Sequence, residues 1–328
     1  SLSTSGWRAA FSLPRTAGST DDWPGETLMT IPRGFSIGHW TDSRARTGCT
    51  VVLAPGKTVG GCDVRGSSPG TRETALLESG KKMDEVHALL LSGGSAYGLA
   101  AADGVMKFLE ERGIGYRTPW GIVPIVPGAV VFDLGVGSAS VRPGPSEGYA
   151  AASAASAAEI PEGAVGGGTG ATVGKWGGPG LSMQGGFGLS SMERGPLIVS
   201  AASVVNALGD VIDDKGEIVA GARNPDGSWC ADSDPLRTLW RAAPSSNTVL
   251  VAVLTNAILT KVDANRVAMR AHDGMARAVR PVHTSYDGDT VFCLASGEVP
   301  ADIDLVAEMA ARVTAMSIRR AVTVSPAP

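Results

Sequence analysis

The residue pair Asn247-Thr248 places a small hydroxyl side chain where a polar loop meets an apolar run. Residues 214–246 are polar and irregular, and Thr248 opens a run of apolar residues that continues to Leu254. A threonine hydroxyl can attack the carbonyl of the preceding residue, which moves the acyl group from nitrogen to oxygen, and hydrolysis of that ester frees the α-amine. The amine, whose ordinary pKa is about 8, can then act as general base for its own hydroxyl. By spacing alone, a threonine that opens a strand is also ordinary β-propensity.

The elements that must position this pair are short strands and helices in alternating blocks. Strands are expected at residues 49–54, 86–91, 197–205, 248–254 and 290–295, and helices at 96–112, 147–159, 260–279 and 301–319. Thr260 and Asp263 fit a capping box at the start of the third helix. A turn at Gly209-Asp210 predicts a hairpin after the strand that ends at 205. Strand blocks with helices outside them indicate a layered α/β sandwich.

The composition is that of a globular protein whose core uses small side chains. Of the 328 residues, 43% are hydrophobic, 18% are charged, 5% are aromatic and 44 are glycine. This length exceeds that of a usual domain, although a single large layered α/β domain reaches it. Residues 1–29 mix Gly, Ser, Thr, Asp and Pro, which predicts a polar N-terminal arm.

Charge, hydropathy and cysteine usage argue against several classes of protein. The net charge is only −4 and the basic residues are scattered, so we expect no nucleic-acid partner. No run approaches the roughly 18 apolar residues of a membrane span, and the first residues do not resemble a secretory leader. We therefore expect a soluble, cytoplasmic protein without a membrane partner. The four cysteines, at positions 49, 62, 230 and 293, have no metal-ligand spacing, which favours inert thiols over zinc or disulfides.

Residues 163–188 form a glycine-dense segment that contains GGGTGATVGK (166–175). A phosphate-binding loop would need Ser or Thr after its lysine, but Trp176 follows Lys175, and nucleotide binding is therefore rejected. Glycines allow close approach of the backbone to other groups. We expect this cluster to let the main chain come close to an active site.

Several long motifs resemble those of the L-aminopeptidase/D-esterase family, in the same order and from about Ile31 to Ala321. They are TGCTVVLAP (47–55), DVRGSSPGTRET (63–74), LLLSGGSAYGLAAADGVM (89–106), IVPGAVVFDL (125–134), GGGTGATVGK (166–175) and the stretch 254–292, which ends in VRPVHTSYDGDTVF. That family includes β-peptidyl aminopeptidases, nylon-oligomer hydrolases and a pantetheine-cleaving amidase. A run of long motifs in one order is specific for a family.

The resemblance implies a four-layer αββα sandwich of the type shared with ornithine acetyltransferases. It implies a single domain over residues 30–328, made as a precursor and cut into an α chain (1–247) and a β chain (248–328). Thr248 then matches the nucleophile and Asn247 the residue before the cut. The family also implies a homo-oligomer, a dimer or tetramer of cut units, and no metal or cofactor.

Four further residues match functional positions of the family. Asn206 matches the asparagine that stabilises the oxyanion, although an asparagine at a strand end also serves as a structural cap. Lys175 matches a lysine of nylon-oligomer hydrolases that favours the neutral amine or binds developing charge; alone it would pass for a solvated surface lysine. Asp287 and Asp289 match paired acids that orient the hydroxyl and amine of Thr248, whereas D-G-D alone is most often a turn.

The chain departs from parts of the family pattern. Members with a serine nucleophile carry Ser and Glu near the D-G-D position, so this chain is closer to the nylon-hydrolase pattern. Phe132 stands where some relatives place a tyrosine, which removes a hydroxyl there. Tyr97 fits either the wall of a substrate pocket or a core-facing helix position.

The resemblance thus predicts a self-processing threonine hydrolase for short peptides, β-peptides or linear amide oligomers. A nearby acidic group would select a free amino terminus and make it an aminopeptidase, while the D-G-D pattern leaves an endo-acting oligomer hydrolase open. An acyltransferase of the ornithine acetyltransferase type and an uncleaved binding protein remain as alternatives.

Overall fold

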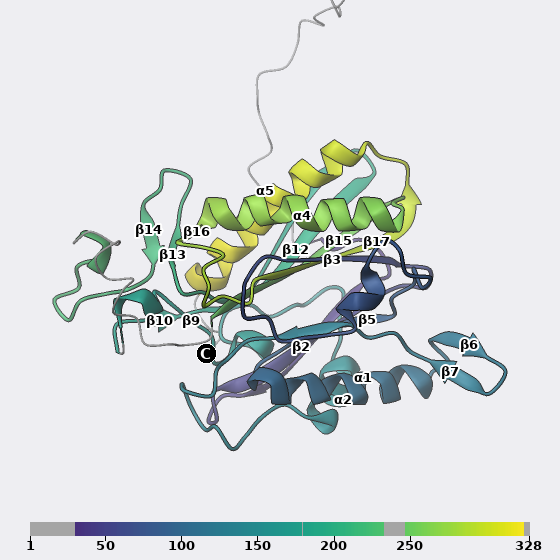
Figure 1. Cartoon of the computed structure of the whole chain (residues 1–328), viewed down its shortest axis with the longest axis horizontal. Helices are drawn as coiled ribbons and strands as arrows, with labels where there is room; N and C mark the ends of the chain where they lie inside the picture. Colours follow the sequence, from purple (N-terminus) through teal and green to yellow (C-terminus); the bar gives the residue numbers. More distant parts are fainter. Residues whose placement is uncertain (1–29, 179, 233–246, 325–328) are drawn as a thin grey trace, which may run out of the picture.

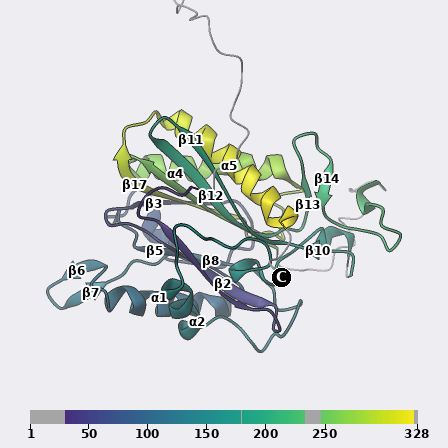
Figure 2. The same ribbon diagram turned by 180° about the vertical axis from the view of Figure 1, so that it is seen from behind.

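The computed structural model describes residues 30–178, 180–232 and 247–324 as a four-layer sandwich. Two five-stranded sheets lie face to face, and two helices cover the outer face of each sheet (Figure 1). The view from behind shows the same layers (Figure 2). The predicted αββα sandwich is confirmed, while the predicted N-terminal arm, residues 1–29, lies outside the described residues.

The first sheet carries the N-terminal motifs, and helices α1 (Ala101–Glu110) and α2 (Pro145–Ser153) pack on it. Its strands, in spatial order, are β1 (Ser36–Asp42), β2 (Thr47–Leu53), β5 (Ala88–Ser92), β8 (Gly128–Val130) and β4 (Thr71–Arg72). Glycines let the two helices touch, because a Cβ at position 104 would lie 1.7 Å from the Pro145 carbonyl oxygen.

The second sheet holds Thr248, and helices α4 (Lys261–Ala278) and α5 (Ile303–Thr323) cover it. Its strands, in spatial order, are β11 (Gly186–Arg194), β12 (Leu197–Asn206), β15 (Thr248–Ala257), β17 (Thr290–Val299) and β3 (Val59–Val64). The predicted capping box at the start of α4 is confirmed, since the Thr260 side chain accepts from the Asp263 N–H and the Asp263 side chain from the Thr260 N–H.

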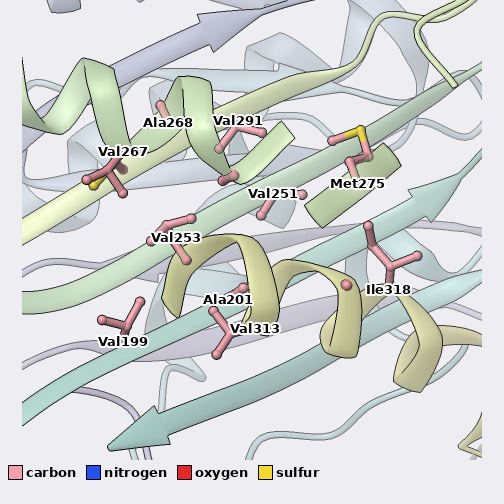
Figure 3. Packing of buried hydrophobic residues seen from close by; sticks show 14 of the residues in the cluster. Val199, Ala201, Val251, Val253, Val267, Ala268, Met275, Val291, Val313 and Ile318 are labelled. Atoms are coloured by element: carbon pink, nitrogen blue, oxygen red, sulfur yellow. The ribbon is translucent and has the colours of Figure 1, made fainter. Parts of the chain in front are cut away.

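Strand β15 is buried along its whole length because both of its faces meet apolar layers. Leu250, Ala252 and Leu254 point between the two sheets. The alternate residues point to the helices, and Figure 3 shows Val251 and Val253 there among side chains from β12, α4 and α5. The continuous apolar run after Thr248 therefore places that residue at the end of a strand fixed on both faces.

Shorter elements lie outside the two main sheets. They are β6 (Tyr116–Thr118), β7 (Gly121–Val123), β9 (Thr172–Val173), β10 (Met183–Gln184), β13 (Asp210–Ile212), β14 (Ile218–Ala220) and β16 (Val279–Arg280), with 3-10 turns at Thr74–Leu77, Ser95–Ala100, Gly166–Gly168, Lys175–Gly177 and Cys230–Asp232. No helix among the described residues is long and apolar enough to cross a membrane.

Three predicted elements differ from the structure. The prediction of a hairpin after residue 205 is wrong, because β13 pairs with β14 and β16 in a separate small sheet. The helix expected over 96–112 begins as a 3-10 turn and becomes α-helical only at Ala101. The helix expected over 147–159 ends at Ser153, because Ser156 exchanges two backbone hydrogen bonds with Ile37 of β1.

Candidate active site

Asn247 and Thr248 lie where the chain enters β15, and both are buried, with Thr248 only 3% exposed. The Thr248 hydroxyl donates a hydrogen bond to the carbonyl oxygen of Asn247. The same oxygen accepts the Gly288 N–H at 2.7 Å, and the Asn247 N–H donates to the Tyr286 carbonyl at 3.0 Å. The nucleophile candidate is therefore in contact with the carbonyl group that self-cleavage would attack.

The segment at residues 65–68 binds the turn at 286–289, which contacts Asn247. The Ser68 N–H donates to the Asp287 carbonyl at 2.9 Å, and the Arg65 N–H donates to the Asp289 carbonyl at 3.0 Å. A Cβ at Gly66 would lie 2.2 Å from the Asp287 carbonyl oxygen, so only glycine fits there without a shift. The segment 63–74, which the sequence analysis quoted only as a family motif, thus supports the turn at 286–289.

The two predicted acids are buried near the Asn247–Thr248 pair, and each accepts hydrogen bonds from residues other than Thr248. Asp289 Oδ1 accepts the Val249 N–H at 2.8 Å, and Asp289 Oδ2 accepts from His283. Asp287 Oδ2 accepts the N–H and the hydroxyl of Thr284 at 2.8 and 2.6 Å. Direct hydrogen bonds from these acids to Thr248 stay a prediction for the cut enzyme.

Burial and the neighbouring charge of Asp289 raise the pKa of Asp287 to about 6, against the lowering effect of the Thr284 hydrogen bonds. Asp287 therefore changes its charge close to neutral pH. A carboxylate that titrates in this range beside a candidate nucleophile is typical of functional sites.

Asn206 ends β12 directly opposite Thr248 of β15 in the antiparallel pairing. Its side-chain Oδ1 accepts from Lys175 Nζ at 2.7 Å and from the Thr172 N–H at 3.0 Å. Its Nδ2 donates to the Phe132 carbonyl at 3.2 Å. Two donors on Oδ1 fix the orientation of the amide, so that Nδ2 presents its N–H bonds on the other side.

Lys175 reaches this amide from the end of the glycine-dense segment and also donates to the Asn206 main-chain carbonyl at 2.9 Å. The alternative interpretation of Lys175 as a solvated surface lysine is therefore excluded. Gly174 adopts φ +75°, and a Cβ there would lie 2.0 Å from the Ala222 nitrogen, so glycine is required just before the lysine. The main chain of this segment comes close to Asn206 at the Thr172 N–H, while its approach to an active site stays a prediction.

The surroundings of Lys175 bring its pKa close to neutral pH, so its charge depends on pH. Desolvation lowers the pKa of Lys175 to about 7, although the negative charges of Asp287 and Asp133 act to raise it. Asp133 is buried, accepts from the Thr47 hydroxyl at 2.6 Å and from the Gly94 N–H at 2.7 Å, and has a pKa raised by burial. Both Lys175 and Asp287 thus titrate near neutral pH.

Sequence reasoning missed four residues of this site. Asp133 lies inside the quoted motif IVPGAVVFDL, directly after Phe132, and its carboxyl type was the available signal. His283, Thr284 and Gly288 lie in the quoted stretch HTSYDGD, where only the acids were selected. Their roles depend on a folded turn, which residue types alone do not specify.

The two tentative pocket residues have different positions. Phe132 is partly buried, and its carbonyl joins the site through Asn206. Tyr97 is 61% exposed, with the Arg142 guanidinium 4.1 Å from its ring centroid, so a core-facing position is wrong. Its role as a pocket wall stays a prediction. Within the described ranges, no group of three or more His, Cys, Asp or Glu side chains forms a candidate metal site.

Comparison with known proteins shows the family of this chain. The sequence model of peptidase family S58 matches residues 30–326. An uncharacterized aminopeptidase of Mycobacterium leprae is 43% identical over 293 residues, which cover 82% of this chain and 78% of the relative. A 6-aminohexanoate-oligomer endohydrolase of Kocuria sp. is 32% identical over 284 residues, which cover 84% of this chain and 76% of the relative.

Solved structures share the fold. The L-aminopeptidase D-Ala-esterase/amidase of Ochrobactrum anthropi superposes with a TM-score of 0.67 at 17% identity, and a β-aminopeptidase of Burkholderia sp. with 0.66 at 18%. Each comparison covers 90% of this chain and 85% of the solved chain. The predicted family and a hydrolase acting on amide bonds are confirmed by the sequence matches. The chain belongs to peptidase family S58.

Proposed function

We propose that this protein is a self-processing amide hydrolase that cuts its own chain between Asn247 and Thr248 and then uses Thr248 as an N-terminal nucleophile. One observation carries the proposal: the Thr248 hydroxyl contacts the Asn247 carbonyl oxygen, which also accepts the Gly288 N–H at 2.7 Å. Negative charge that develops on this oxygen during attack would meet a donor that is already in place.

The bond changes of self-cleavage balance as follows. Thr248 Oγ1 forms a bond to the Asn247 carbonyl carbon and loses its proton, and the carbonyl oxygen takes the negative charge. Collapse of this intermediate breaks the carbon–nitrogen bond, and the nitrogen takes up a proton. Water then hydrolyses the ester, which leaves a carboxylate on Asn247 and a free amine and hydroxyl on Thr248. The products are chains 1–247 and 248–328.

In the cut enzyme, the free Thr248 amine accepts the proton of its own hydroxyl as the hydroxyl attacks a substrate amide. A cationic Lys175 nearby disfavours protonation of that amine, which keeps it available as a base. Asn206 has two N–H bonds on Nδ2; one is directed to the Phe132 carbonyl, and the other supports the oxyanion of the substrate. Water releases the acyl group from Thr248.

The substrates proposed are short peptides, β-peptides or linear amide oligomers. Relatives named as an aminopeptidase and as a 6-aminohexanoate-oligomer endohydrolase support this range. The two possibilities differ in whether a free amino terminus is needed next to the amide that is cut.

The proposal is tested by assaying wild-type protein and the variants Thr248→Ser and Thr248→Ala on two substrate sets. These are amino-acid amides and p-nitroanilides with a free amine, and 6-aminohexanoate oligomers blocked at both ends. We expect wild type and Thr248→Ser to cut at least one set and Thr248→Ala to cut neither. Cleavage of blocked oligomers identifies endo activity. Hydrolysis by Thr248→Ala at the wild-type rate, or products that require an added amine acceptor, would contradict the proposal.

A further inference from the structure

His283 makes a two-point contact with one carboxylate oxygen of the site. Its backbone N–H and its ring Nδ1 lie 3.1 and 2.8 Å from Asp289 Oδ2. This geometry is possible because His283 has a left-handed backbone, with φ +54°. Such a conformation is uncommon for residues other than glycine and persists where the surrounding structure imposes it.

The other oxygen of the same carboxylate binds the strand that carries the nucleophile. Asp289 Oδ1 accepts the Val249 N–H at 2.8 Å, one residue after Thr248. Asp289 is 1% exposed, so water does not replace either set of donors easily. His283, Asp289 and Val249 are therefore connected by hydrogen bonds that run from the loop at 281–284 to the start of β15.

The neighbours of the His283 ring favour its hydrogen bond to Asp289. Because a carboxylate only accepts hydrogen bonds, Nδ1 must carry the proton that is donated to Asp289. The ring packs edge to face on buried His272, with centroids 4.8 Å apart, and His272 in turn contacts the Asp63 carbonyl through Nε2 at 3.1 Å. Burial lowers the pKa of His272 to about 4, so that a neutral ring supports His283 near neutral pH.

We propose that His283 is a positioning residue: it orients the Asp289 carboxylate, which in turn holds Val249 and thereby fixes Thr248 against the Asn247 carbonyl. The inference rests on the proposed self-cleavage and adds a residue that does not itself touch the reacting atoms. Small displacements of a nucleophile have large effects on rate, about 100-fold for 1 Å. Removal of the His283 donor is expected to slow self-cleavage by about 10- to 100-fold.

The test uses three substitutions that separate the donor from the backbone conformation. Glycine and asparagine both tolerate a left-handed backbone, so His283→Gly removes the ring donor without strain and keeps the backbone N–H, whereas His283→Asn keeps a side-chain N–H donor near the position of Nδ1. His283→Gln carries its donor one bond further out. The rate of self-cleavage is measured from intact masses over time in freshly made protein, and the melting temperature of each variant is measured alongside.

We expect His283→Gly to cleave about 10- to 100-fold more slowly and His283→Asn to recover most of the rate, with His283→Gln no better than His283→Gly. In the double variant with Asp289→Asn, the His283→Gly change should add little, because it acts through Asp289. Equal rates for His283→Gly and wild type would overturn the proposal, as would additive effects in the double variant or no gain from asparagine. A wild type that never cleaves would overturn the proposed function itself, and this inference with it.

Discussion

The two sides of Thr248 are built from different interactions. On one side, the turn at 286–289 binds the chain through backbone hydrogen bonds. The Gly288 N–H donates to the Asn247 carbonyl, and the Asn247 N–H donates to the Tyr286 carbonyl. On the other side, Lys175 brings a labile positive charge to Asn206, with Asp133 as a nearby buried anion.

The backbone contacts thus fix the position of the Asn247–Thr248 bond, whereas the charged side chains determine the charge around it. Backbone hydrogen bonds do not titrate, so the backbone contacts of the turn hold the Asn247–Thr248 bond in the same way over a wide range of pH. The charged side chains around the site do titrate, because the pKa is about 7 for Lys175 and about 6 for Asp287, whose carboxyl group belongs to the turn itself. Changes to the backbone contacts of the turn should therefore alter the rate without moving its pH profile, whereas changes to the charged side chains should alter both.

The largest effect is expected from Lys175→Met, which keeps most of the length of the side chain but removes its charge and its hydrogen-bond donors. Loss of a preorganised charged group at a site of developing charge lowers rates by about 100- to 1000-fold. We expect that loss in kcat per mole of cut enzyme, with slower self-cleavage and no fall of rate on the alkaline side. Lys215→Met, at an exposed lysine in the turn between β13 and β14, is the control and should change nothing.

The next effect is expected from Gly288→Ala on the turn side. The added Cβ would lie 2.8 Å from Thr248 Oγ1 and 2.7 Å from the Ser68 carbonyl oxygen, so the hydroxyl must move. Self-cleavage should slow by about 100-fold, with an unchanged pH profile. Gly56→Ala, where nothing lies within 4 Å, is the matched control. A shifted pH profile in Gly288→Ala would remove the distinction between the two sides.

A smaller effect is expected in the pH dependence of wild-type self-cleavage, in which no free α-amine yet contributes. The rate should rise with pH as Asp287 loses its proton near pH 6 and fall as Lys175 loses its charge near pH 7. Each limb should change the rate by about tenfold per pH unit beyond its pKa. A rate that is flat from pH 5 to about 9 would contradict the assignment of both groups.

The smallest effect is expected from Asp133→Asn. The negative charge of Asp133 raises the pKa of Lys175, so its removal lets that pKa fall further. The alkaline limb should move to lower pH, by no more than about one unit, while the acid limb stays in place. The melting temperature, compared between this variant and wild type, checks that the fold is kept. An alkaline limb that moves to higher pH would contradict the proposed electrostatics.

The sequence predicted the layers and the strand that carries Thr248 because both depend on local apolar patterns. The run after Thr248 is apolar on both faces, and the structure buries both faces. The capping box at Thr260 depends only on neighbouring residues, and the structure forms it. Asn206, Lys175, Asp287 and Asp289 came from the family resemblance, and the structure brings them around Thr248.

What the sequence did not predict depends on contacts between distant segments. The small sheet of β13, β14 and β16 joins segments about seventy residues apart, so local pattern favoured a hairpin with β12 instead. Asp133 becomes relevant only because β8 places the residues that follow it near Lys175. Residues 1–29 and 233–246 lie outside the described structure, and the arm predicted for the former remains a prediction.

The most direct test of the central claim is the intact mass of freshly purified wild-type protein under denaturing conditions, measured beside Thr248→Ala. The account predicts two wild-type fragments that meet between Asn247 and Thr248, the smaller with a free threonine amine, and a single full-length chain for the variant. A wild-type chain that stays full-length through long incubation, or a variant that is cut at the same bond, would contradict it.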